Sequence, residues 1–206
     1  MKKVKEFRDY IITRTCTEQY SHYRSYKTAL REDFKHRCAY CNLLDEIVTT
    51  YFEIDHFIPK KTCEEIGRGD LIVNYDNLVY SCKKCNLAKT NKYESSGLDD
   101  DIKNNRFYEP VETPLQEIFY RNIWGGIDSY DSKGRRMIID LKLYRISHNL
   151  EWIIEVLQNI CEKLERKISE QDVKGIDTTD LMCAYYLIST EYHKLHKVFI
   201  SNYNTM

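Results

Sequence analysis

The chain has 206 residues, which is enough for one hydrophobic core or a small catalytic module with helical additions and too few for several independent domains. Its 31% charged and 42% hydrophobic residues, with seven glycines and three prolines, are typical of a folded, mostly helical protein and argue against disorder. The formal net charge of −1 excludes the overall basic excess of a nucleic-acid binder that works alone.

The sequence also indicates where the protein is found. No segment contains the roughly 20 consecutive apolar residues that a membrane-spanning helix needs. The first five residues, MKKVK, precede an amphipathic segment instead of the apolar core of a signal peptide. We therefore expect a cytoplasmic protein without membrane association, in which clustered cysteines bind metal ions and do not form disulfide bonds.

Two amphipathic helices are predicted in residues 1–37, separated by a break near residues 15–17. We expect their apolar faces to pack on the module that follows. Helical spacing is kept by Val4, Phe7 and Ile11 in the first helix and by Tyr23, Tyr26, Leu30 and Phe34 in the second.

The pattern changes in residues 38–93, which we interpret as a separate small module. A β-branched and aromatic run at residues 47–58 and a shorter run at residues 78–80 predict two strands. A helix is expected to begin near Cys85, and the strands are flanked by two pairs of cysteines.

Each cysteine pair has the spacing C-x-x-C, and two such pairs can bind one tetrahedral zinc ion with Zn–S distances of about 2.3 Å. Four thiolates leave no position for water or substrate, so this zinc is predicted to stabilise the fold. His36 lies near enough to replace a ligand, but with four cysteines present we expect it only to end a helix. The pairs are Cys38 with Cys41 and Cys82 with Cys85, whereas the thiols expected to be ordinary are Cys16, Cys63, Cys161 and Cys183.

Residues 94–206 are predicted to hold a connector, a hairpin and long helices. The polar segment 91–105 is interpreted as a connector, and its acidic triplet at residues 99–101 as a solvated loop in preference to a metal site. Residues 118–128 and 135–139 flank a sequence, residues 131–134, with the chemistry of a hairpin turn. Two helices broken at Lys174-Gly175 are then marked by apolar stripes: Leu150, Ile153, Ile154, Leu157, Ile160 and Leu164 in the first, and Met182, Tyr185, Ile188, Tyr192, Leu195 and Phe199 in the second.

An acid and an imidazole, Asp55 and His56, lie side by side at the end of the first predicted strand of the module, just before Pro59. In a regular strand their side chains point to opposite faces, so the chain must bend for both to serve one site. A histidine in a strand is more often structural than catalytic, and this pair alone does not define a function.

The pair belongs to a longer array that resembles the zinc-containing branch of the HNH endonuclease family. The resemblance covers about a quarter of the chain and implies two antiparallel strands and one helix around a divalent ion. The array reads Cys38-x-x-Cys41, Ile54-Asp55-His56-x-Ile58-Pro59-Lys60, Asp76-Asn77-Leu78-Val79 and Cys82-x-x-Cys85-Asn86-x-x-Lys89.

The resemblance also implies roles for the matching residues. Asp55 and Asn86 would bind Mg²⁺ or Mn²⁺ through oxygen, and His56 would be the general base that takes a proton from the attacking water. Asn77 would hold the imidazole in its reactive tautomer and orientation. Lys89 would help to hold the scissile strand, although a solvated helix residue is an equally good interpretation, and Glu53 receives no role.

Residues 119–145 resemble the tail of small bacterial HNH proteins found in phage-defence operons. Some of these are nuclease subunits that act with an ATPase partner, as in Septu-like systems, which would fit the missing basic excess. We therefore expect an α+β, predominantly helical DNA endonuclease that acts in antiviral defence with a partner protein or a second copy of itself. The alternative is a zinc-stabilised nucleic-acid-binding or protein-binding module without catalysis.

Overall fold

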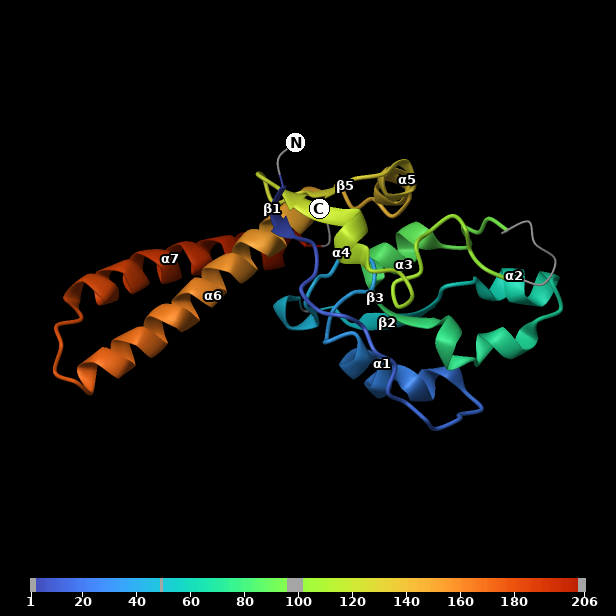
Figure 1. Ribbon diagram of the computed structural model, residues 1–206, viewed down its shortest axis with the longest axis horizontal. Helices are drawn as coiled ribbons and strands as arrows, with labels where there is room; N and C mark the ends of the chain where they lie inside the picture. Colours follow the sequence, from blue (N-terminus) through green and yellow to red (C-terminus); the bar gives the residue numbers. More distant parts are fainter. Residues whose placement is uncertain (1–2, 49, 96–101, 204–206) are drawn as a thin grey trace. The chain divides into compact units, whose positions relative to one another are not determined.

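The computed structural model of the chain describes residues 3–48, 50–95 and 102–203. It forms two compact units, Met1–Tyr144 and Arg145–Met206, and the first contains the predicted nuclease module together with segments on both sides of it. Helices dominate, and the strands form one three-stranded and one two-stranded sheet, so the fold class is α+β as predicted (Figure 1). The acidic triplet at residues 99–101 lies outside the described residues.

The centre of the first unit is a strand-strand-helix motif. Strand β2 (Phe52–His56) pairs antiparallel with β3 (Leu78–Cys82), and α3 (Lys83–Lys89) follows β3 directly. Every residue of β3 is buried, as expected for its apolar, β-branched and aromatic run. The Cys82 thiol accepts a hydrogen bond from the Cys85 amide at 3.4 Å and so caps the helix, which begins two residues before the predicted start.

The connection between β2 and β3 folds back on the ends of both strands. It contains α2 (Lys60–Glu65) and two 3₁₀ turns, η3 (Gly69–Ile72) and η4 (Tyr75–Asn77). A small core of Ile58, Cys63 and Leu71 holds this connection together. The connection therefore packs as an ordered segment beside the end of β2.

The first predicted helix is wrong, because strand β1 (Lys3–Glu6) begins the described chain and no regular element follows it until residue 23. Strand β1 pairs antiparallel with β4 (Phe119–Asn122). Phe7 is buried with its ring centroid 5.4 Å from that of Phe119, whereas Ile11 is 74% exposed, so Phe7 and Ile11 do not share a face. Long-range strand pairing has overridden the local periodicity.

The second N-terminal helix is confirmed. It starts as a 3₁₀ turn, η1 (Tyr23–Tyr26), and continues as α1 (Lys27–Asp33). Tyr26, Leu30 and Phe34 are buried within the first unit, whereas Tyr23 on the turn is partly exposed.

The predicted hairpin is wrong, because residues 135–139 are helical and do not form its second strand. A different hairpin lies within residues 119–129, where the first strand was predicted. A short helix, α4 (Leu115–Ile118), leads into β4, which pairs with β5 (Ile127–Ser129) across a turn in which Gly125 has a φ of 74°. Residues 131–134 instead open a helix, α5 (Ser132–Asp140), whose N-cap Asp131 accepts a hydrogen bond from the Gly134 amide at 2.6 Å. Aspartate accepts this bond at a helix start as readily as in a turn, so the sequence was ambiguous.

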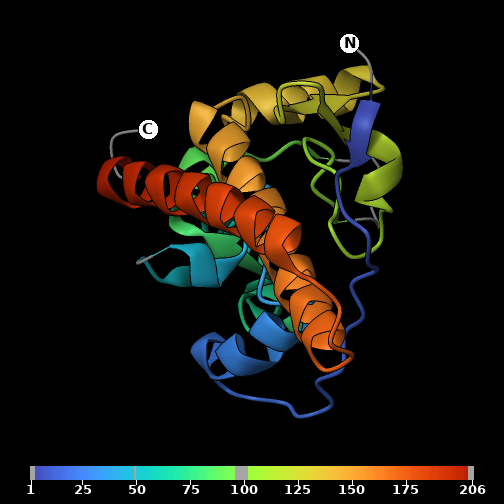
Figure 2. The same cartoon turned by 90° about the vertical axis from the view of Figure 1, so that its left-hand side faces the viewer.

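The second unit is a hairpin of two long helices, α6 (Ile146–Asp172) and α7 (Thr179–Asn202), as predicted (Figure 2). The break falls where it was expected, with Gly175 at a φ of 68°. Met182 was predicted to be buried but is 56% exposed, and it lies in the first turn of α7, next to the loop that joins the two helices. Within the described residues, no helix is both long and apolar enough to span a membrane.

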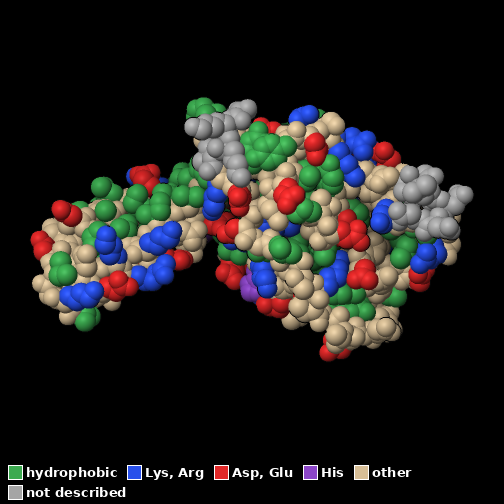
Figure 3. Space-filling view, in the orientation of Figure 1, with side chains coloured by type: hydrophobic (Ala, Val, Ile, Leu, Met, Phe, Trp, Pro, Cys, Tyr) green, Lys and Arg blue, Asp and Glu red, His purple; other side chains and the backbone are tan. Residues whose placement is uncertain are grey.

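Acidic and basic side chains are interspersed over the face shown in Figure 3, and no part of that face is covered by one sign of charge alone. This distribution agrees with 31 basic and 32 acidic residues in the chain. Any site for a polyanion must therefore rest on a local group of cations.

Candidate active site

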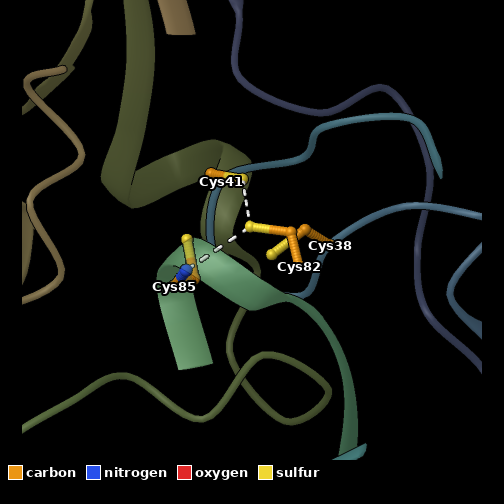
Figure 4. A group of neighbouring side chains, drawn as sticks. All are labelled: Cys38, Cys41, Cys82 and Cys85. Carbon is orange, nitrogen blue, oxygen red and sulfur yellow. Dashed lines mark hydrogen bonds between the residues drawn. The ribbon is translucent and has the colours of Figure 1, made fainter. Parts of the chain in front are cut away.

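Four cysteine thiols meet beside the strand-strand-helix motif (Figure 4). All four are buried, and their sulfur atoms lie within 4.8 Å of one another. The Sγ atoms of Cys41 and Cys82 are 3.8 Å apart, which matches the edge of about 3.8 Å in a tetrahedron with Zn–S bonds of about 2.3 Å. The cluster therefore has the donor chemistry and the size of a closed zinc site.

The turn that carries the first cysteine pair is fixed from two sides. The Ala39 amide donates to the Tyr80 carbonyl at 2.8 Å, which ties the turn to β3. Asn42 adopts a φ of 65° at the end of the turn, and its side chain accepts from the Tyr10 hydroxyl at 2.8 Å and donates to the Phe7 carbonyl at 3.0 Å. The extended N-terminal segment thus braces the cysteine turn.

His36 takes no part in the thiol cluster. Its ring nitrogens lie 3.1 Å from a Glu32 carboxylate oxygen and 3.2 Å from one of Glu46, and these two carboxylates raise its pKa. Nearby Asp45 pairs with Arg31 at 2.7 Å. These ion pairs connect α1 to the segment after the cysteine turn.

Asp55 is buried at the end of β2 and contacts two other buried side chains. The Tyr40 hydroxyl donates to its Oδ2 atom at 2.6 Å, and the Lys89 ammonium lies 3.1 Å from the same oxygen. Burial raises the pKa of Asp55, and the positive charge of Lys89 and the Tyr40 hydrogen bond oppose this rise. Asp55 is thus held in a fixed orientation by groups from the cysteine turn and from α3.

The position of Lys89 contradicts the expectation that it touches substrate. Its side chain is fully buried and also donates to the His56 carbonyl at 2.7 Å. A lysine on the inner face of α3 reaches β2 and not solvent, and a buried ammonium needs such acceptors. Lys89 joins the helix to the strand.

The His56 imidazole has a defined tautomer. Its Nε2 atom lies 2.9 Å from the Ile72 carbonyl oxygen, which can only accept, so Nε2 carries the proton and Nδ1 keeps its lone pair. Burial lowers the pKa of His56 to about 4, with the charges of Lys60 and Lys89 adding to the effect and the Ile72 bond opposing it. The imidazole is neutral at neutral pH, as a general base must be.

Asn77 supports His56 through the backbone and does not touch the imidazole. Its Oδ1 atom accepts from the Ile58 amide at 2.7 Å, and its Nδ2 atom donates to the carbonyls of Ile58 and Leu71 at 3.1 and 3.0 Å. These bonds fix the chain just after His56 and just before Ile72, whose carbonyl orients the ring.

Glu53 and Asn86 are joined by a hydrogen bond that the sequence patterns did not reveal. The Asn86 amide nitrogen donates to Glu53 Oε2 at 2.6 Å, which turns the Asn86 oxygen away from Glu53. Glu53 lies two residues before Asp55 and therefore on the same face of β2. This alternation was the available signal for including Glu53 in the site.

One cavity of about 660 Å³ brings most of these side chains together. Among the predicted residues, Asp55, His56 and Asn86 line it, whereas Asn77 and Lys89 do not. The lining from outside the module comes from η1 and the first residue of α1. The charged residues that line the cavity are Arg24, Lys27, Glu53, Asp55 and Lys60.

Comparison with protein families adds a decisive observation: residues 38–92 match the family described as HNH endonuclease. The chain contains an HNH endonuclease domain. The match places residues 38–92 in a family of nucleases that use divalent metal ions.

Two curated relatives of this chain are both named Septu protein PtuB. The chain is 32% identical over 120 residues to that of Bacillus thuringiensis, in a match that covers 58% of this chain and 41% of the relative. It is 30% identical over 106 residues to that of Bacillus mycoides, covering 48% of this chain and 34% of the relative. The matches thus span less than half of each relative, and no solved structure matches the chain.

Proposed function

We propose that the chain is a metal-dependent endonuclease that hydrolyses phosphodiester bonds in DNA as the nuclease component of a bacterial phage-defence system. The observation that carries the proposal is the meeting of the His56 base with the oxygen donors Asp55 and Asn86 in one cavity of an HNH domain. The Septu name of both relatives supports the defence role.

The donor set suits a hard divalent ion. Asp55 and Asn86 would hold Mg²⁺ or Mn²⁺ through oxygen, since a carboxylate has lone pairs beyond those used by Tyr40 and Lys89. Glu53 contributes by holding the Asn86 amide nitrogen, which leaves the amide oxygen for the ion. When bound, the ion supplies positive charge that stabilises the departing 3′ oxygen and a non-bridging phosphate oxygen.

His56 performs the proton transfer. As a water oxygen attacks phosphorus, Nδ1 accepts the proton of that water, and the bond between phosphorus and the 3′ oxygen breaks. The Ile72 carbonyl keeps Nδ1 as the acceptor throughout. A bound phosphodiester brings negative charge beside the ring, which raises the pKa of the imidazole and makes it a stronger base in the complex than in the free protein.

The four cysteines would bind one structural zinc ion. Their sulfur atoms come from the cysteine turn, the end of β3 and the first turn of α3, so one ion would lock these three segments together. The site is closed to substrate, and this zinc has no part in the chemistry.

The net charge of −1 indicates that the chain needs a partner protein to bind DNA well. Non-specific DNA binding draws its free energy mostly from phosphate neutralisation, and a net charge of −1 supplies little of it. We propose that an ATPase, another defence subunit or a second copy of the chain places the domain on DNA.

The experiment is a plasmid-cleavage assay on the purified chain with Mg²⁺ or Mn²⁺, with and without the product of the neighbouring gene. We expect metal-dependent cleavage that the partner accelerates. No cleavage under any of these conditions, with folded and zinc-loaded protein, would favour the alternative of a binding module without catalysis.

A further inference from the structure

A wall of positive charge on the candidate active-site cavity lies mostly outside the matched HNH segment. Arg24 on η1 and Lys27 at the start of α1 line the cavity, and Lys60 at the start of α2 lines it beside His56. Only Lys60 belongs to residues 38–92. The chain before the HNH domain therefore contributes directly to the surface that faces the catalytic base.

Tyr23 connects two of these cations to His56, because its ring contacts both of them and the imidazole. The two rings meet edge to face with centroids 4.8 Å apart. The Lys60 ammonium lies 4.0 Å from the centre of the Tyr23 ring, and the Arg24 guanidinium carbon lies 5.8 Å from it. A cation on an aromatic face is attracted without being neutralised, so Tyr23 holds both cations beside its ring without pairing them with an acid.

The three cations differ from other basic residues nearby. Lys61 pairs with Glu65 at 3.6 Å, and Arg31 pairs with Asp45 at 2.7 Å. Among the residues that the structure describes, Arg24, Lys27 and Lys60 form no ion pair. Three unpaired like charges around one cavity repel one another, and an anion in the cavity relieves that repulsion.

The acidic residues of the cavity lining do not cancel the positive charge of Arg24, Lys27 and Lys60. Asp55 and Glu53 are the acidic residues that line it, and Asp55 already pairs with buried Lys89. The cavity thus combines a local excess of cations with a chain whose net charge is −1. Such a local excess selects a polyanion at this position in preference to the rest of the surface.

We propose that Arg24, Lys27 and Lys60 form a phosphate-binding wall that holds the nucleic-acid strand beside His56 through the phosphates next to the scissile one. The wall rests on the proposed nuclease function. In this proposal Arg24, Lys27 and Lys60 align the nucleic-acid strand so that the scissile phosphate lies between the imidazole and the oxygen donors of β2 and α3.

The test measures binding separately from cleavage. Binding of a short fluorescent DNA duplex to the full chain is followed by anisotropy over a range of salt concentrations, in the His56→Ala background so that the probe stays intact. The slope of log K against log salt is negative, and each lost phosphate contact reduces its magnitude by about 0.9. Arg24→Gln, Lys27→Gln and Lys60→Gln combined should therefore reduce the magnitude by about 2 to 3.

Lys61→Gln is the matched control, because it removes one equal charge one residue from Lys60 but outside the cavity; it should leave the slope unchanged. Lys60→Arg should keep the slope of the background protein. The wall is ruled out if the triple variant binds with the slope of the Lys61→Gln control, or if the background protein does not bind the duplex even at low salt.

The two proposals fail in different ways. If the protein with native His56 never cleaves but its DNA binding depends on the three cations, the nuclease proposal falls and the wall stands. If the triple variant with native His56 cleaves and binds as well as the Lys61→Gln control, the wall falls and the nuclease proposal stands. Melting temperature and zinc content are measured for every variant to show that it is folded.

Discussion

Tyr40 lies between the two cysteines of the first pair, and its hydroxyl donates a hydrogen bond of 2.6 Å to the Asp55 carboxylate. Both side chains are buried. The turn that would hold zinc therefore also fixes the carboxylate that would hold the catalytic ion. This relationship links the stability of one metal site to the geometry of the other.

The first prediction concerns the structural metal. Purified protein should contain about one zinc per chain, and Cys82→Ser should lower both the zinc content and the melting temperature, because Cys82 also caps α3. Elemental analysis and thermal unfolding measure the two effects. Cys16→Ser, which lies outside the cluster, is the control and should match wild type. A zinc-free protein, or a Cys82→Ser variant that melts like wild type, contradicts the prediction.

Tyr40→Phe should weaken the catalytic metal site while leaving the fold intact. The ring still fills its place, but Asp55 loses a hydrogen bond of the charged type, which is typically worth about 1.5–3 kcal/mol. The Mn²⁺ concentration for half-maximal cleavage should rise on the order of tenfold or more.

Tyr108→Phe is the matched control for Tyr40→Phe, because it removes a tyrosine-aspartate bond of 2.7 Å to Asp131 away from the cavity's oxygen donors. It should leave the metal requirement unchanged. Equal metal requirements for the two variants would show that Tyr40 does not position Asp55.

Glu53 and Asn86 should act as a coupled pair. Glu53→Ala frees the Asn86 amide to rotate, so it should weaken Mn²⁺ binding, and so should Asn86→Ala. Because the two residues act through one hydrogen bond, the double variant should be hardly worse than Asn86→Ala alone. Calorimetric titration with Mn²⁺ measures all four proteins, and purely additive losses would exclude the proposed orientation of Asn86.

Lys89→Met should reduce stability more than DNA binding. Removing the cation leaves the Asp55 carboxylate buried without its ionic partner, at a cost of about 3–5 kcal/mol in the free energy of unfolding. Urea unfolding measures this loss, with exposed Lys61→Met as the control. Lys89 contacts substrate after all if Lys89→Met unfolds like wild type but the slope of log K against log salt for DNA binding becomes less negative.

The centre of the fold could be predicted from the sequence because its signals are local. The cysteine spacing, the two apolar runs and the order of Asp55, His56, Asn77 and Asn86 fall within one short segment, and their geometry follows from two strands and a helix. The pairing of β1 with β4 could not be predicted in this way, since it depends on residues more than 100 positions apart.

The surroundings of Lys89, Glu53, Arg24 and Lys27 also depend on contacts between distant parts of the sequence, so they could not be predicted. Lys89 was given a solvent-facing role because the sequence does not say which face of α3 meets β2. Glu53 was given none because its partner, Asn86, is 33 residues away. Arg24 and Lys27 join the cavity only through the packing of η1 on His56, which no motif records.

The most direct test of the central claim is the cleavage rate of His56→Ala with plasmid DNA and Mn²⁺, compared with wild type at equal zinc content and equal melting temperature. In the structure His56 lines the cavity, and the contact of Nε2 with the Ile72 carbonyl leaves Nδ1 as the nitrogen with the lone pair. Loss of a positioned general base predicts a rate lower by at least about 10²-fold, with metal binding retained. Near-normal cleavage by folded His56→Ala would contradict the mechanism.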